Sequence, residues 1–194
     1  MRLPRPVLAA GLIGVLALSG CGGTAVATGT GSSSAASRNV QVSASFSTTP
    51  GVAVTYDQGL VKAGSRGAVS AQSGNGSTTV MLALRGLEPN RRYGAHAHSK
   101  PCGETGDAAG PHFQYTVDPV QPSVDRQYAN PQNEIWLDLT TDPTGAGSAE
   151  TTVAWGFPTD RRAESVVIHA MPTATDPGKA GTAGARAACI TVDF

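Results

Sequence analysis

The chain has 194 residues, enough for one domain with a substantial hydrophobic core. Only 14% of the residues are charged and the formal net charge is zero, which excludes a nucleic-acid-binding protein that relies on a basic surface. Aromatic residues are scarce at 5%, and the 24 glycines favour an all-β domain with many turns over a helical one.

The N-terminus has the pattern of an export signal. Arg2 and Arg5 precede an apolar run over residues 7–18, which is too short to span a membrane comfortably. The run ends in "LSGC", which resembles a bacterial lipobox, the motif whose cysteine is lipidated and becomes the new N-terminus. We therefore expect a signal peptide over residues 1–20 and a lipid on Cys21. An ordinary cleaved signal is the alternative.

Residues 21–38 follow as a segment of Gly, Ser, Thr and Ala with almost no charge. Such a composition cannot bury a core and is typical of a flexible tether. We expect it to hold a folded domain, residues 39–194, away from a membrane.

From residue 40 onward, apolar side chains alternate with polar ones, the period of a half-buried strand. Turn signals such as "DPTGAG" and "DPGKAG" separate the candidates, and no long apolar run has helical spacing. The predicted strands are 40–46, 51–56, 60–64, 67–72, 78–87, 93–98, 134–142, 148–155, 164–171 and 188–194. Many short strands without helices between them predict an antiparallel sandwich or barrel.

Two segments interrupt this rhythm, one over about residues 99–133 and the other over residues 171–187. Both are long, rich in Gly and Pro, and poor in apolar residues. Loops of this length in a compact domain are usually functional. Each begins just after a histidine, so the histidines are the first candidates for a site.

The sequence has four histidines, and three of them lie close together. His96 and His98 are two residues apart on a predicted strand, so both point to one face while Ala95 and Ala97 point to the other. Two adjacent imidazoles suit a metal that takes nitrogen donors, although two surface histidines would give the same pattern. His169 ends another predicted strand and by itself would indicate a packed or exposed residue.

Together, the stretches "GAHAH", "AGPHF", "VVIHA" and "AGARAAC" match in order the metal-site landmarks of the copper,zinc superoxide dismutases. The chain resembles this family over about residues 40–194. The resemblance implies an all-β, Greek-key antiparallel β-sandwich or flattened β-barrel with two long functional loops. It also implies four copper ligands, which are His96, His98, His112 and His169. Every histidine of the chain would then be used.

The cysteines agree with this resemblance. Cys21 is assigned to lipid, which leaves Cys102 and Cys189 as an even pair in an exported domain and indicates one disulfide. In the family, such a bridge ties the loop after the His-x-His pair to the last strand. Arg186 lies three residues before Cys189, where the family has an arginine beside copper that attracts the anionic substrate. The resemblance thus implies catalytic roles for Arg186 and His112.

The zinc site of the family has no counterpart here. The family holds zinc with the bridging histidine, two further histidines and an aspartate, but the loop after His112 contains no histidine. Its carboxylates would complete only a poor zinc site; they are Asp118, Asp125, Glu134 and Asp138. We therefore expect copper without zinc. The candidates for a carboxylate that orients the copper ligands are Glu134, Asp138 and Asp176.

The resemblance implies an exported, copper-only superoxide dismutase of the bacterial lipoprotein form, an antioxidant enzyme. It would convert superoxide to dioxygen and hydrogen peroxide at the outer face of the cell membrane, anchored by the lipid on Cys21, without binding nucleic acid. The alternative is a non-enzymatic copper-binding lipoprotein that sequesters or delivers the ion. Arg186 and the long loops favour the enzyme, while the missing zinc ligands keep the copper binder open. A third interpretation, an adhesion-like sandwich without metal, leaves the histidines unexplained.

Overall fold

The computed structural model describes residues 37–194. The predicted signal peptide, Cys21 and the predicted tether as far as residue 36 lie outside the described residues. The first strand, β1, spans Arg38–Ser45 and so starts one residue before the predicted start of the domain.

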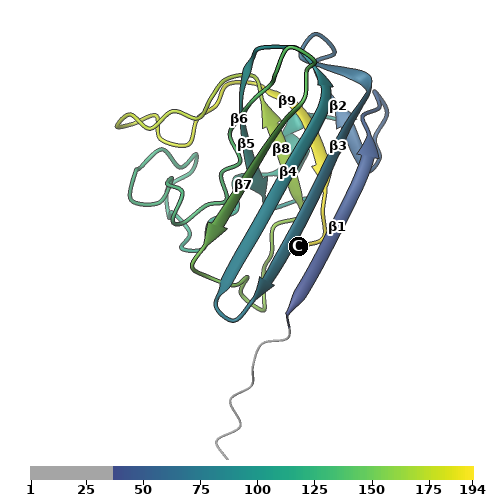
Figure 1. Ribbon diagram of the computed structural model, residues 1–194. Helices are drawn as coiled ribbons and strands as arrows, with labels where there is room; N and C mark the ends of the chain where they lie inside the picture. The colour runs from purple at the N-terminus through teal and green to yellow at the C-terminus, as the bar shows by residue number, and fades with distance from the viewer. Residues whose placement is uncertain (1–36) are drawn as a thin grey trace, which may run out of the picture. The chain divides into compact units, whose positions relative to one another are not determined.

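Two antiparallel sheets pack face to face (Figure 1). The first sheet has the order β1, β3 (Val61–Gly74), β4 (Ser77–Leu87) and β7 (Gly147–Val153). The second has the order β2 (Ala53–Thr55), β9 (Arg186–Thr191), β8 (Ser165–His169), β5 (Arg92–His98) and β6 (Leu139–Thr140). The chain crosses between the sheets from β1 to β2, from β2 to β3, from β4 to β5, from β6 to β7 and from β7 to β8. This arrangement confirms the predicted Greek-key β-sandwich.

The core lies between the sheets, and the period-two pattern of the sequence decides which side chains fill it. Along β1, partly buried and exposed residues alternate without a break. Val69, Leu82 and Leu84 of the first sheet are buried in the same cluster as Ile168 and Ile190 of the second. The other face of the first sheet carries mostly polar side chains in water, together with the exposed Met81, and a solvated polar face is the usual pattern for an antiparallel sheet.

The second sheet is covered on both faces. All five residues of β8 are buried, and so are all but the first of β5. On the side away from the core, Val167 and Cys189 form a small apolar cluster with Ala109, which belongs to the short 3-10 helix η1 (Gly106–Ala109). Loops therefore roof this outer face, and side chains on it are withdrawn from water.

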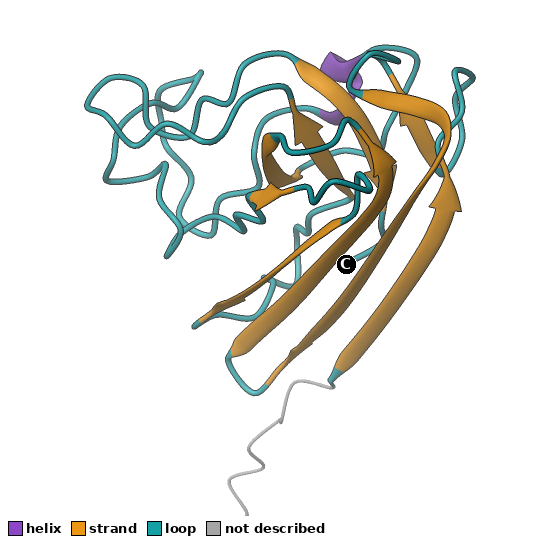
Figure 2. Cartoon of the chain, turned by 45° about the horizontal axis from the view of Figure 1, so that its top comes forward, coloured by secondary structure: helices purple, strands orange, loops and turns teal. Residues whose placement is uncertain are grey.

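The two long loops run over residues 99–138 and 170–185 and extend from the same side of the sandwich (Figures 1 and 2). The strand predicted over residues 134–142 is mostly irregular: it follows β5 through isolated bridges and hydrogen bonds, and only Leu139–Thr140 joins the ladder as β6. The second loop ends earlier than expected, because β9 already begins at Arg186.

Candidate metal centre

Two strands of the second sheet present three of the histidines on its outer face. His96 and His98 lie on β5, fully buried under the loops, while Ala95 and Ala97 between them pack into the core. This confirms the predicted division of the strand. His169 ends β8 directly opposite Gly94 of β5, so its side chain leaves the same face of the sheet.

The first long loop supplies the fourth histidine. His112 forms a backbone bridge with His98, and the amide of Phe113 donates to the carbonyl of Ala97 at 2.9 Å. These contacts fix the loop along the end of β5. The His112 side chain keeps 18% of its surface exposed, because it borders a cavity.

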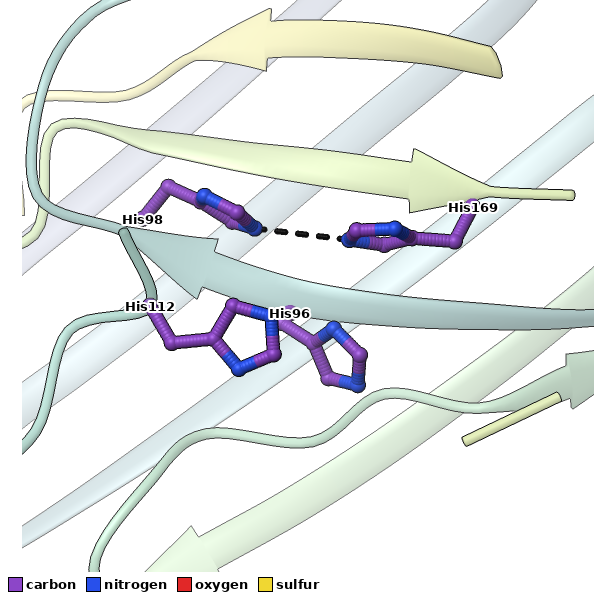
Figure 3. Close-up of side chains that lie close together, drawn as sticks. All are labelled: His96, His98, His112 and His169. Atoms are coloured by element: carbon purple, nitrogen blue, oxygen red, sulfur yellow. Dashed lines mark hydrogen bonds between the residues drawn. The ribbon is translucent and has the colours of Figure 1, made fainter. Parts of the chain in front are cut away.

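The four rings surround a common point (Figure 3). The centroid of His96 lies 4.2 Å from that of His112 and 4.9 Å from that of His169, and the His98 and His112 centroids are 4.7 Å apart. One ring nitrogen from each histidine lies within 4.8 Å of the other three. Two nitrogens on opposite sides of a metal about 2 Å from each would be about 4 Å apart, so the set has nearly the size of a metal site.

Hydrogen bonds show which nitrogen each ring keeps free. The Nδ1 atoms of His98, His112 and His169 face oxygens that only accept: the Gly110 carbonyl at 2.9 Å, the Glu134 carboxylate at 2.7 Å and the Gly184 carbonyl at 3.4 Å. Nδ1 must therefore carry the proton in these three rings, and Nε2 has a lone pair. The Nε2 atoms of His98 and His169 are only 3.4 Å apart. Two lone pairs that face each other call for a cation between them.

His96 has the opposite arrangement. Its Nε2 lies 2.7 Å from the hydroxyl oxygen of Thr173, whereas its Nδ1 is buried without a hydrogen-bond partner among the described residues. A buried polar atom without a partner is costly and needs an explanation. A metal bound by this nitrogen and by the three Nε2 atoms provides one, so the residues fit a nitrogen-ligated metal ion.

Burial lowers the pKa of His96, His98 and His169. It holds the pKa of His96 and of His98 well below the usual value of 6.5, and the neighbouring imidazoles add to the effect, His112 first. Burial also lowers the pKa of His169 to about 3, again with help from His112. Neutral imidazole is the form that binds metals, so these three rings are ready to bind a cation at neutral pH.

Glu134 is a fully buried carboxylate beside His112. Its Oε2 accepts from His112 Nδ1 and from the Trp136 indole nitrogen, each at 2.7 Å, and its Oε1 accepts from the Gln114 amide at 2.8 Å. Among the described residues, the Glu134 carboxylate thus has three hydrogen-bond donors and no Lys or Arg partner. Of the three carboxylates expected to orient the ligands, Glu134 is the one that contacts a histidine directly within hydrogen-bond distance.

The other predicted carboxylates have different places. Asp138 reaches His96 only through Thr173, because its Oδ1 is 3.9 Å from His96 Nε2. Asp176 lies exposed in the second loop, and Asp118 and Asp125 accept hydrogen bonds from residues of the first loop. Thr173, Gln114 and Trp136 were not anticipated. No spacing or composition signal marks them: Thr173 and Trp136 contact His96 through the tertiary fold, and Gln114 reaches the site through Glu134.

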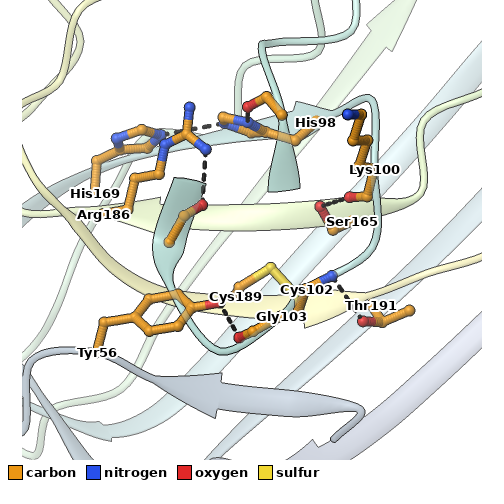
Figure 4. The surroundings of a disulfide bond; sticks show 12 residues. Tyr56, His98, Lys100, Cys102, Gly103, Ser165, His169, Arg186, Cys189 and Thr191 are labelled. Carbon is orange, nitrogen blue, oxygen red and sulfur yellow. Dashed lines mark hydrogen bonds between the residues drawn. A yellow bond between two sulfur atoms is a disulfide. The ribbon is translucent and has the colours of Figure 1, made fainter. Parts of the chain in front are cut away.

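Arg186 borders a cavity of about 350 Å³ that His112, His169 and Glu134 also line. Its Nη1 donates to the carbonyl of Gly106 in η1 at 2.7 Å, which holds the guanidinium beside His169 (Figure 4). Burial lowers the pKa of Arg186 from its usual value and Asp107 opposes this, but arginine stays protonated at neutral pH. The cavity thus joins a fixed positive charge to the edge of the histidine cluster.

A disulfide joins Cys102 to Cys189, with their Cα atoms 5.8 Å apart, as predicted (Figure 4). It fastens the start of the first long loop to β9. The amide of Cys102 also donates to the Thr191 hydroxyl at 3.2 Å, and the Tyr56 hydroxyl donates to the Gly103 carbonyl at 3.1 Å. These contacts secure the segment that carries Gly106 and, through it, Arg186.

Comparison with known proteins gives similar solved structures and one family. The chain is similar to a Cu/Zn superoxide dismutase from Brucella abortus, with 19% identity and a TM-score of 0.53 over 81% of this chain and 100% of that one. It is also similar to a double mutant of a SOD-like protein from Bacillus subtilis, with 17% identity and a TM-score of 0.45 over 64% of this chain and 87% of that one. No curated protein matches the sequence. The family model described as copper/zinc superoxide dismutase (SODC) matches residues 65–192, so the chain belongs to the copper/zinc superoxide dismutase family.

Proposed function

We propose that this protein is an exported, membrane-anchored superoxide dismutase that uses copper without zinc. It would convert two superoxide anions and two protons to dioxygen and hydrogen peroxide. The observation that carries the proposal is the convergence of four ring nitrogens within 4.8 Å of one another, at the edge of a cavity that His112, His169 and Arg186 line. The reaction is that of the family to which the chain belongs.

Copper is the metal that the donor set favours. His96 would bind through Nδ1, and His98, His112 and His169 through Nε2, which is an all-nitrogen set that suits Cu(II). When bound, copper supplies a one-electron couple between Cu(II) and Cu(I). The protein supplies neutral ligands in fixed tautomers and a roof of loops that keeps two of the rings fully buried.

The contact between Glu134 and His112 supports a site without zinc. A second metal at His112 would have to bind Nδ1, and this atom already donates to Glu134 at 2.7 Å. Zinc would have to displace that proton and find further ligands, but the nearby Trp136 is a donor only. The buried Glu134 carboxylate therefore orients the His112 ring, as a second metal bound at Nδ1 would do.

Arg186 and His112 are the proposed catalytic residues. The guanidinium places a local positive charge at the cavity, which attracts and orients an anion. The reaction also consumes protons. The His112 ring lines the same cavity, and its Nε2 would have to leave the metal and take up a proton from solvent before it could donate that proton to the reduced substrate.

The proposed location rests on the N-terminal sequence. Cleavage before Cys21, lipidation of that residue and a tether of residues 21–38 would place the domain at the outer face of the membrane. The disulfide supports this location, because such bridges persist in oxidising compartments. Among the described residues, no helix is long and apolar enough to cross a membrane.

A superoxide-consumption assay on the copper-loaded full-length protein tests the proposal. We expect the rate per copper to exceed that of loosely chelated copper, metal analysis to give about one copper and little zinc per chain, and His169→Ala to lose copper and activity together. Stoichiometric, tightly held zinc would contradict the copper-only site. Full copper loading without activity above chelated copper would instead support the alternative, a copper-binding lipoprotein that sequesters or delivers the ion.

A further inference from the structure

His96 is the ligand whose free nitrogen differs from that of the other three. It keeps Nδ1 for the shared centre, and its Nε2 lies 2.7 Å from the Thr173 hydroxyl oxygen. An imidazole in water interconverts between its two tautomers, so something in this fold must select one. The ring itself is fully buried, and Thr173 is its hydrogen-bond partner in the described structure.

The partners of Thr173 determine which way the hydrogen bonds run. The hydroxyl has a single proton, and it lies 2.6 Å from Asp138 Oδ1. A carboxylate accepts and does not donate, so Thr173 gives its proton to Asp138. The hydroxyl oxygen can then only accept from His96, which requires a proton on Nε2. The chain of bonds from Asp138 through Thr173 thus leaves a lone pair on His96 Nδ1.

Asp138 is itself held in place. Its Oδ2 accepts from the backbone amide of Thr173 at 2.8 Å, and its Oδ1 accepts from the amide of Ala95 at 3.3 Å. The distance of 3.9 Å between Asp138 Oδ1 and His96 Nε2 is too long for a hydrogen bond. The carboxylate therefore acts on the imidazole through the hydroxyl between them.

Close backbone packing brings Thr173 to this position. The Gly94 amide donates to the Met171 carbonyl at 2.8 Å, which lays the start of the second long loop directly on β5. A Cβ at Gly94 would come within 2.7 Å of the Met171 carbonyl oxygen and 3.0 Å of the Thr173 hydroxyl oxygen. The absence of a side chain at Gly94 is what lets the hydroxyl reach His96.

We propose that Thr173, held by Asp138, is a positioning residue that fixes His96 in the Nε2–H tautomer and so presents its Nδ1 to the metal. The identity of the metal rests on the proposed function, whereas the tautomer is a property of the metal-free protein. The two can therefore be tested separately. The contact also ties the loop of residues 170–185 to a ligand that lies 77 residues earlier in the chain.

The first test needs no metal. Long-range ¹⁵N–¹H correlation spectra of the metal-free full-length protein report which nitrogen of His96 is protonated. We expect the proton on Nε2 in the wild type and in Thr173→Ser, which keeps the hydroxyl. Thr173→Val removes the hydroxyl and should give the other tautomer or a mixture. Thr175→Val, the same change at an exposed position of the same loop, is the matched control and should resemble the wild type.

The second test adds Cu(II) and follows affinity and the electron paramagnetic resonance spectrum. Loss of a contact that orients a ligand typically weakens metal binding about 10–100-fold. We expect this loss and an altered spectrum in Thr173→Val, with recovery in Thr173→Ser and no change in Thr175→Val. A merely structural role for Thr173 would lower stability without changing the spectrum.

Three results would overturn the proposal: a wild-type His96 with its proton on Nδ1, a Thr173→Val protein with the wild-type tautomer, or the same variant with unchanged copper affinity and spectrum. The wild-type measurement decides the tautomer even if Thr173→Val does not fold. If no variant binds copper while the tautomer is as expected, the proposed function fails and the assignment of Thr173 to the His96 tautomer stands.

Discussion

Each of the four imidazoles uses one nitrogen for a bond within the protein and keeps the other for the shared centre. The partners are the Gly110 and Gly184 carbonyls, the Glu134 carboxylate and the Thr173 hydroxyl. Backbone carbonyls cannot be removed by mutation, but the two side chains can. Substitution of single side chains therefore tests how the ligands are held. Glu134, which contacts His112, and Arg186, which lines the cavity, allow the clearest substitutions.

Glu134→Gln should weaken both the fold and the copper site. The carboxylate accepts three hydrogen bonds, and an amide nitrogen in its place would meet at least one donor, leaving a buried polar group without a partner. We expect a loss of about 1–3 kcal/mol in the free energy of unfolding and about 10–100-fold in copper affinity. Urea unfolding and competitive copper titration measure the two. Glu150→Gln, at an exposed position of β7, should change neither, and an unchanged Glu134→Gln would remove the assigned role.

Arg186→Ala should separate copper binding from catalysis. The four imidazoles remain, so copper should stay bound, but the rate should fall because the local charge that attracts superoxide is lost. The remaining activity should also depend less on ionic strength, since salt screens that charge. Arg126→Ala, at an exposed position of the first loop, serves as the control. Equal rates for Arg186→Ala and the wild type, both with full copper, would refute the catalytic role.

Among the elements, the disulfide connects the first long loop to β9. This strand lies between β8 and β2 in the second sheet. Cys189 pairs with Val167 of β8 and Val54 of β2, so the bridge joins the loop to an inner strand of the second sheet. Gly106, four residues beyond Cys102, then meets Arg186 through its carbonyl. A single covalent link thus supports both the fold and the position of the guanidinium.

Replacing both cysteines, Cys102→Ser with Cys189→Ser, should destabilise the domain. The bridge spans 87 residues, and loss of a native disulfide typically costs about 2–5 kcal/mol. Urea unfolding should show this loss, and hydrogen exchange should increase over residues 99–112. Thiol labelling of the unreduced wild type should find neither cysteine free. Exchange that stays unchanged in the double variant would show that the noncovalent contacts alone hold the loop.

At the scale of the whole molecule, the buried histidines relate stability to pH. Their pKa values are lowered by burial, to about 3 for His169, so the folded protein resists protonation while the unfolded chain takes up protons near pH 6.5. Below pH 6.5 the unfolded state therefore binds more protons, and stability falls with falling pH until the folded groups titrate. This dependence belongs to the metal-free protein, because a bound metal would compete with the proton.

The metal-free protein should accordingly lose stability between pH 6.5 and about pH 3. Each such histidine contributes about 1.4 kcal/mol for every pH unit over which only the unfolded form is protonated. Urea unfolding at pH 7, 6 and 5 measures the slope, and copper should move the onset to lower pH. A free energy of unfolding that stays level from pH 7 to pH 5 would contradict the burial of neutral imidazoles.

Cys21→Ala should release the protein from the membrane fraction or leave its signal uncleaved. The expectation rests on the sequence around "LSGC", which lies outside the described residues. Fractionation of cells and intact-mass measurement check it. Native protein with an unmodified Cys21 would show that the segment is not a lipoprotein signal.

The sequence by itself determined that the domain is an antiparallel β-sandwich or barrel, and its resemblance to a known family indicated the four histidines of the centre. Strand period fixes the face of each side chain, so His96 and His98 had to point away from Ala95 and Ala97. The order of the motifs then indicated His112 and His169 through family resemblance. Local alternation gives the face of His96 and His98, and the family resemblance implies the other two ligands, so neither step requires knowledge of which distant residues touch.

The tertiary structure alone decided how each ring is held. Thr173 meets His96 across 77 residues, and Glu134 meets His112 across 22, from a segment that the alternation marked as a regular strand but that is mostly irregular. A lone threonine or glutamate in a loop carries no periodic signal. Its role arises when the fold buries it against a ring nitrogen, where an unpaired polar atom is costly and the hydrogen bond must be made.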